Sequence, residues 1–142
     1  MIRLLTGMIA LVSSLMFVAC QTYTSSLVES TNRVDETVAL STLRSIDTAQ
    51  KLYSVTHEGN YGTLPQLSEA GYLDSRFKQD KPLKDYLLTV NVKSASDGGP
   101  SYSCVADPEA DRPGRHFYID SSSGTIHVNP TQRASPSDPT IQ

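Results

Sequence analysis

Four acidic residues in the second half of the chain have the side chains and spacing of a calcium site. Asp107, Glu109 and Asp111 occupy alternate positions, and Asp120 follows after a loop. Calcium is bound by several oxygen ligands on a flexible loop, and alternate acidic positions present their carboxylates to one side. Two arginines lie among them, so a charged loop with solvated ion pairs is the alternative. These four residues are the candidate metal ligands.

The other reactive side chains do not form a catalytic pattern. His57, His116 and His127 are scattered, and no serine or cysteine motif accompanies them. The sequence has no glycine-rich phosphate loop and no paired-cysteine metal spacing. The net charge is -3 and basic residues do not cluster, which excludes the electrostatic footprint of a nucleic-acid-binding protein. We expect a protein that is not an enzyme and has no cofactor beyond possible calcium.

Cys20 has the strongest chemical signal in the sequence. It ends a segment in which Arg3 precedes a mostly apolar run from Met8 to Ala19, the layout of a secretory signal peptide. The run is shorter than the roughly 20 residues that a membrane-spanning helix needs. Phe17-Val18-Ala19-Cys20 resembles a bacterial lipobox, with Phe17 in place of the usual leucine. The motif predicts removal of residues 1–19 and a lipid on Cys20, followed by a polar tether, residues 20–29.

Two other interpretations of the N-terminal segment stay open. An ordinary signal peptide followed by an incidental cysteine fits the same composition. Gly7-Met8 is also similar to a prepilin cleavage site, although Val12 stands where such sites usually carry glutamate.

The hydrophobic pattern of the mature chain changes period part way along. Apolar residues recur at spacings of three and four over residues 27–57, which predicts one long helix. A capping box from Thr63 to Gln66 predicts a short second helix. β-branched and aromatic residues separated by turn signals then predict strands at 86–92, 101–106, 116–120 and 125–128. We therefore expect an α+β domain with a long N-terminal helix on a three- to four-stranded antiparallel sheet.

Two further expectations concern single segments. Cys104 lies in an apolar alternating stretch and is predicted to be a small buried hydrophobic residue rather than a nucleophile. Residues 129–142 are rich in proline, serine and threonine, which predicts a disordered tail.

The order of elements and several short motifs resemble the globular head of type IV pilin-like proteins, especially the major pseudopilin of type II secretion. Residues 39–50 are similar to the family's A-x-x-x-L-R-x-I-x-x-A-Q helix segment. Tyr53 with residues 59–67 is similar to its Y…G-x-Y-G-T-L-x-x-L turn, and residues 71–74 to its G-x-I/L-D step. Residues 118–126 resemble its closing Y-x-D-x-x-G-x-I hairpin. Some pseudopilin heads bind calcium in the same β-region.

The chain departs from this family at its N-terminus. The apolar, membrane-embedded half of the family's helix is missing and a lipobox stands there, so the resemblance implies the head fold and not a fibre subunit. We expect a signal peptide (1–19), a lipidated tether (20–29), a pilin-like head (30–128) and a disordered tail (129–142).

The expected function is that of a lipid-anchored envelope protein facing the periplasm, a structural or protein-interaction module. Its expected partners are the membrane, through the lipid on Cys20, and envelope, secretion or pilus proteins. Gln21 after the cysteine favours the outer membrane. A periplasmic lipoprotein that binds calcium or a small ligand is the alternative.

Overall fold

The computed structural model describes residues 30–79 and 83–141. The chain divides into two compact units, residues 1–34 and residues 35–142. The expected signal peptide, Cys20 and the tether lie outside the described residues. Within the described ranges, no helix is both long enough and apolar enough to cross a bilayer.

The long helix covers residues 30–56. Its inner face is apolar because Ala39, Leu43, Ile46 and Ala49, at spacings of three and four, are at most 1% exposed. The helix ends where the backbone turns left-handed at Glu58 and Gly59, with φ of 54° and 84°. The Gly59 N–H donates to the Ser54 carbonyl at 2.9 Å, the bond that closes a Schellman-type end.

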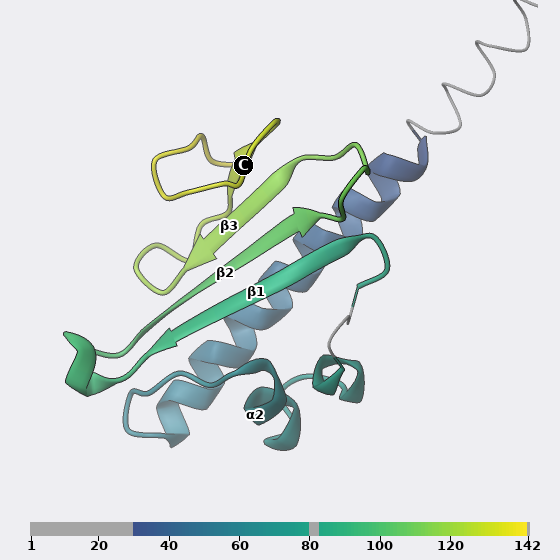
Figure 1. Cartoon of the computed structure of the whole chain (residues 1–142). Helices are drawn as coiled ribbons and strands as arrows, with labels where there is room; N and C mark the ends of the chain where they lie inside the picture. Colours follow the sequence, from purple (N-terminus) through teal and green to yellow (C-terminus); the bar gives the residue numbers. More distant parts are fainter. Residues whose placement is uncertain (1–29, 80–82, 142) are drawn as a thin grey trace, which may run out of the picture. The chain divides into compact units, whose positions relative to one another are not determined.

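Four antiparallel strands follow the chain order in one sheet, β1-β2-β3-β4. They are β1 (Tyr86–Lys93), β2 (Ser101–Pro108), β3 (His116–Asp120) and β4 (His127–Asn129). Figure 1 shows the long helix running behind this sheet. In the register, Cys104 lies opposite Val90 on β1 and Ile119 on β3. Alternate residues of each strand therefore face the helix.

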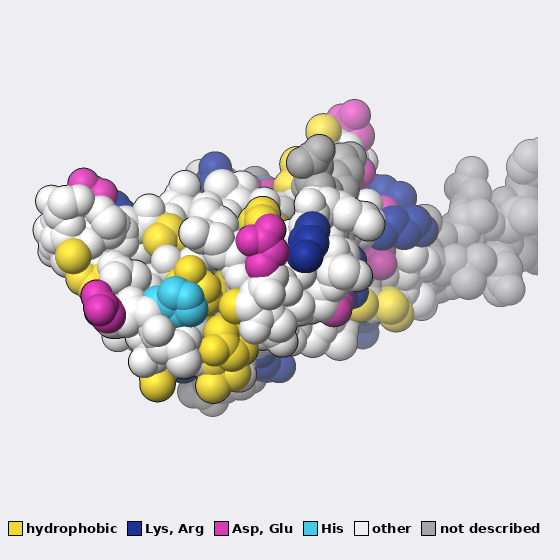
Figure 2. Space-filling view, turned by 90° about the horizontal axis from the view of Figure 1, so that it is seen from below, with side chains coloured by type: hydrophobic (Ala, Val, Ile, Leu, Met, Phe, Trp, Pro, Cys, Tyr) yellow, Lys and Arg dark blue, Asp and Glu magenta, His cyan; other side chains and the backbone are white. Residues whose placement is uncertain are grey.

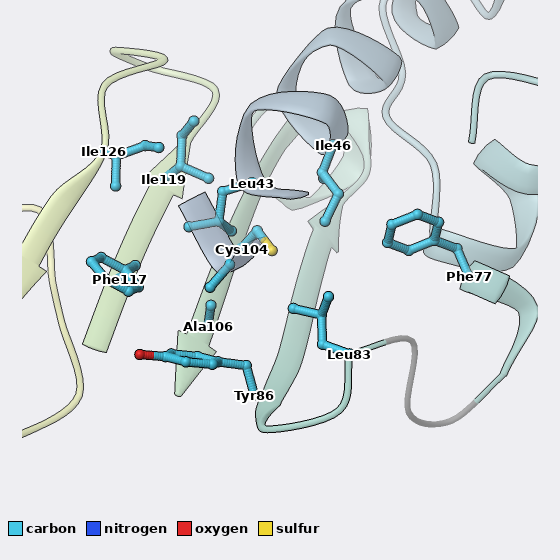
Figure 3. Packing of buried hydrophobic residues seen from close by; sticks show 11 residues of the cluster. Leu43, Ile46, Phe77, Leu83, Tyr86, Cys104, Ala106, Phe117, Ile119 and Ile126 are labelled. Carbon is cyan, nitrogen blue, oxygen red and sulfur yellow. The ribbon is translucent and has the colours of Figure 1, made fainter. Parts of the chain in front are cut away.

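The core lies between the long helix and the sheet. Leu43 and Ile46 from the helix meet Cys104 from β2 and Phe117 and Ile119 from β3, all at most 1% exposed (Figure 3). Full burial of a side chain of this size contributes about 1.5–3 kcal/mol each. The predicted α+β class, a long helix packed on a four-stranded antiparallel sheet, is confirmed.

Short helical segments lie between the long helix and the sheet and between the first two strands. Helix α2 (Leu64–Glu69) begins with the predicted capping box, in which the Thr63 N–H donates to Gln66 Oε1 at 2.8 Å. The 3₁₀ segment Ser75–Lys78 follows and buries Phe77 against the core cluster. A second 3₁₀ segment, Ala95–Asp97, joins β1 to β2.

The C-terminal segment differs from the expectation of a disordered tail. Residues 129–141 fold back along β4, with an isolated bridge between His127 and Thr140 (Figure 1). Ala134 is 4% exposed, and Ile141 packs against the core cluster. The segment is held by the apolar side chains of Ala134 and Ile141 and by local polar hydrogen bonds. The amino-acid composition did not predict this docking, because an average over the whole segment does not detect two apolar residues among many polar ones.

Candidate functional site

The four predicted calcium ligands have separate roles in the structure. Asp107 on β2 accepts from His116 Nδ1 at 2.7 Å and pairs with Arg133 Nε at 3.3 Å. Asp120 ends β3, and its Oδ1 accepts from the Ser122 backbone N–H at 3.0 Å. The part of the chain that the structure describes contains no group of three or more His, Cys, Asp or Glu side chains arranged to hold a metal.

The strand register explains why Asp107 and Asp120 stay apart. Asp120 lies opposite Ser103 on β2, and Asp107 is four residues further along the same strand. At about 3.3 Å per residue, that separates the two positions by roughly 13 Å. Calcium ligands must lie about 2.3–2.6 Å from one ion. Glu109 and Asp111 follow in the β2–β3 loop, so the four residues are spread along the chain.

A groove at the C-terminal end of the long helix is the candidate site. Its volume is about 500 Å³, within the usual range for small-ligand pockets. Figure 2, which views the molecule of Figure 1 from below, shows a histidine with hydrophobic side chains gathered around it. Two walls form the groove, the turn after the helix and the end of β1. Its lining residues are Tyr53, Thr56, His57, Glu58, Asn60, Tyr61, Gln66, Val92, Lys93 and Ser94.

His57 is held in one orientation inside this groove. Its ring stacks on Tyr53 with centroids 3.6 Å apart and an angle of 8° between the planes. Its Nδ1 lies 2.9 Å from the Tyr53 carbonyl oxygen. The same Nδ1 lies 2.9 Å from the Thr56 hydroxyl oxygen. The ring stack and these two contacts hold the His57 side chain against the end of the helix.

Gln50 positions the turn that forms one wall. Its side chain is fully buried, Nε2 donates to the Gly62 carbonyl at 2.7 Å, and Oε1 accepts from the Gly62 N–H at 2.9 Å. A Cβ on Gly62 would lie 3.2 Å from the Tyr53 ring and from Leu67, so a larger residue would press on both side chains. We refer to Gln50, Tyr53, Gly62 and Leu67 as the helix-end corner.

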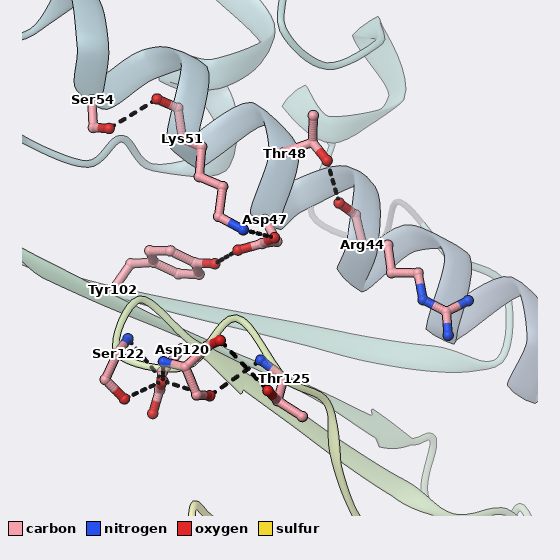
Figure 4. Close-up of polar contacts among 10 residues, drawn as sticks. Arg44, Asp47, Thr48, Lys51, Ser54, Tyr102, Asp120, Ser122 and Thr125 are labelled. Atoms are coloured by element: carbon pink, nitrogen blue, oxygen red, sulfur yellow. Dashed lines mark hydrogen bonds and ion pairs between the residues drawn. The ribbon is translucent and has the colours of Figure 1, made fainter. Parts of the chain in front are cut away.

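A buried carboxylate ties the long helix to β2 near the same wall (Figure 4). Asp47 Oδ1 accepts from the Tyr102 hydroxyl at 2.6 Å, and Asp47 Oδ2 pairs with Lys51 Nζ at 2.6 Å. Burial, followed by the hydrogen bond to Asp47, raises the pKa of Tyr102 above its usual range. Tyr61, which lines the groove, packs edge-on against Tyr102 with centroids 5.0 Å apart. The network therefore fixes Tyr61 relative to the helix.

The sequence indicated the components of this site but not their assembly. Tyr53 is 9% exposed and lies at the margin of the core, whereas His57 is exposed above it. The groove was not predicted from the sequence. The Ala39–Gln50 segment and the Tyr53…Gly59–Leu67 turn, which carry the pilin resemblance, meet in the helix-end corner.

Cys104 is confirmed as a buried hydrophobic residue. It is fully buried in β2, and burial raises the pKa of its thiol to about 12. A neutral thiol that solvent cannot reach is not a nucleophile.

Comparison with known proteins found no family model, curated protein or solved structure that matches the chain. The chemistry of the groove therefore rests on its own geometry. It offers a stacked aromatic and imidazole surface, amide and hydroxyl groups, one carboxylate from Glu58 and one ammonium from Lys93.

Proposed function

We propose that this chain is a lipid-anchored protein of the bacterial cell envelope and that its head is a non-enzymatic, pilin-like interaction module. One observation carries the proposal: the helix-end corner. The motif residues on which the pilin resemblance rests, Gln50 on the helix and Gly62 on the turn, are joined by two buried hydrogen bonds. This pair of hydrogen bonds is a physical reason why the helix segment with Gln50 and the turn with Gly62 are found in the same sequence.

The anchor in this proposal is Cys20. Arg3, the short apolar run and Phe17-Val18-Ala19 before the cysteine supply the features of a lipoprotein signal. In this proposal the polar residues after Cys20 connect the lipid to the folded head. We place the head in the periplasm, at the outer membrane in a host with two membranes.

Exposed apolar side chains on the last turns of the long helix support a protein partner. Leu52 and Val55, three residues apart, are 49% and 83% exposed. Residues three apart lie on the same side of a helix, so the two side chains form one small apolar area that a partner could cover.

The anchor is tested by labelling cells with radioactive palmitate and separating their membranes. The natural chain should be labelled and sediment with the membranes, whereas Cys20→Ser should lose the label and stay uncleaved or become soluble. Cys104→Ala is the matched control, because it removes the buried cysteine and should keep both the label and the membrane association. A label that persists in Cys20→Ser would refute the anchor.

The interaction module is tested by photo-crosslinking in intact envelopes. A photoreactive residue at Val55 should capture a defined envelope protein, identified by mass spectrometry. The same probe at Ser96, an exposed site on the β1–β2 connection, is the control. Equal captures from the two sites would contradict an interaction surface at the helix end.

A further inference from the structure

The docked C-terminal segment occupies the outer edge of β4 with very little pairing. We call residues 130–141 the C-terminal strap. Two backbone hydrogen bonds join its described part to β4: the Val128 N–H donates to the Pro139 carbonyl at 2.8 Å, and the Ile141 N–H donates to the Ile126 carbonyl at 2.9 Å. These bonds flank the single bridge between His127 and Thr140. The strap is thus a short antiparallel edge strand.

Proline at position 139 leaves this pairing incomplete. In an antiparallel ladder, a hydrogen-bonded pair of residues exchanges two bonds, one in each direction. Val128 and Pro139 form such a pair, since Val128 donates to Pro139. Proline has no N–H, so the return bond to the Val128 carbonyl cannot form. A strand with any other residue at this position can make a bond that the strap cannot.

The polar side-chain contacts between the strap and β4 centre on Asp138 and are partly buried. Asp138 accepts from the Ser135 N–H at 2.7 Å and from Asn129 Nδ2 at 2.8 Å, while its carbonyl contacts His127 Nδ1 at 2.7 Å. Arg133, whose side chain is 56% exposed, reaches Asp107 at 3.3 Å. An exposed ion pair of this kind contributes little to stability. The apolar contacts come from Ala134 and Ile141.

We propose that the outer edge of β4 is a strand-addition site for an extended segment of a partner chain, and that the C-terminal strap occupies it as a displaceable internal competitor. Strand addition obtains its affinity from main-chain hydrogen bonds and its selectivity from alternate side chains. The seated strap defines the partner's chemistry. The partner segment has an aliphatic residue with an N–H at the position that Ile141 occupies, and a residue other than proline at the position that Pro139 occupies.

The test measures binding of labelled peptides to the full chain by fluorescence anisotropy. Ile141→Pro in the chain removes both the strap's N–H bond to Ile126 and its aliphatic contact, which opens the edge. The probes are a peptide of residues 130–142, the same peptide with Pro139→Ala, and a control peptide with Ile141→Pro. Circular dichroism and urea unfolding establish that the altered chain keeps its fold.

One extra hydrogen bond should make the Pro139→Ala peptide bind the opened chain about two- to tenfold more tightly than the natural peptide. The control peptide should bind at least tenfold more weakly than the natural one. The natural peptide should also bind the natural chain at least tenfold more weakly than it binds the opened chain, because the tethered strap competes at an effective concentration of about millimolar. Equal binding of the first two peptides, or no binding to a folded Ile141→Pro chain, would overturn the proposal.

Hydrogen exchange on the natural chain gives a second test that needs no altered protein. A displaceable strap opens without global unfolding, so the Ile141 amide should exchange at least a hundredfold faster than the Cys104 amide in the centre of the sheet. Equal protection of the two amides would mean that the strap is part of the cooperative fold, and would also overturn the proposal.

Discussion

Replacing Gln50 by methionine tests whether the helix-end corner is held by the side-chain amide. Methionine has a similar length and fills the same space with apolar atoms, so the change removes two hydrogen bonds and little volume. The Gly62 N–H and carbonyl then lose their partner within a buried turn.

The expected loss of stability follows from these two groups. A buried polar group left without a partner costs about 1–3 kcal/mol, so the two groups together should lower the free energy of unfolding of Gln50→Met by about 2–6 kcal/mol. Domains of this size are stable by about 5–15 kcal/mol, which makes the change a large fraction of the total. At a urea slope of about 2 kcal/mol per molar, the midpoint should fall by about 1–3 M.

Urea unfolding followed by circular dichroism measures this shift. Thr48→Ala is the matched control on the same helix, because the Thr48 hydroxyl is exposed and bonds only within the helix, to the Arg44 carbonyl at 3.0 Å (Figure 4). It should change stability by no more than about 0.5 kcal/mol. A loss below about 1 kcal/mol for Gln50→Met, with an unchanged slope, would show that the amide does not hold the turn.

Three further predictions concern buried groups of the sheet. Tyr102→Phe removes the donor to Asp47 and should lower the free energy of unfolding by about 1.5–3 kcal/mol in urea, because the bond is made to a charged acceptor; no change would mean that Lys51 alone satisfies Asp47. Burial raises the pKa of the Cys104 thiol from 9.0 to about 12, so the unfolded state releases this proton first and stability should fall as the pH rises from about 9 to 12. In the Cys20→Ser chain, Cys104 should resist a thiol reagent at pH 8 until denaturant is added, and fast reaction with the folded chain would contradict its burial.

Much of the fold could be predicted because its signals are local. The three- and four-residue spacing of Ala39, Leu43 and Ile46 indicated the inner face of the long helix, and these side chains are buried. The capping box at Thr63 and the turn residues between the strands likewise depend only on neighbours in the chain. Element types and their order were therefore accessible from the sequence.

The partners of the predicted calcium ligands were less accessible because they depend on contacts between distant residues. Nothing near Asp107 in the sequence shows that β2–β3 pairing brings His116 to one of its oxygens, nor that the strap brings Arg133 to the other. The acidic spacing alone therefore suggested a calcium site. The composition of the strap suggested disorder for a related reason, because averaging over residues hides a single anchor such as Ile141.

The sequence by itself determined the α+β class, the order of the elements along the chain and the burial of Cys104, and it carries the motif from which the lipid anchor is proposed. Local propensities and hydrophobic periods encode the first three, and a processing motif is read along the chain. Only the tertiary structure decided that Gln50 clamps Gly62, that Asp107 and Asp120 lie far apart, and that the strap pairs with β4 opposite the proline at 139. These outcomes depend on strand register and on packing across long sequence separations, which local patterns do not specify.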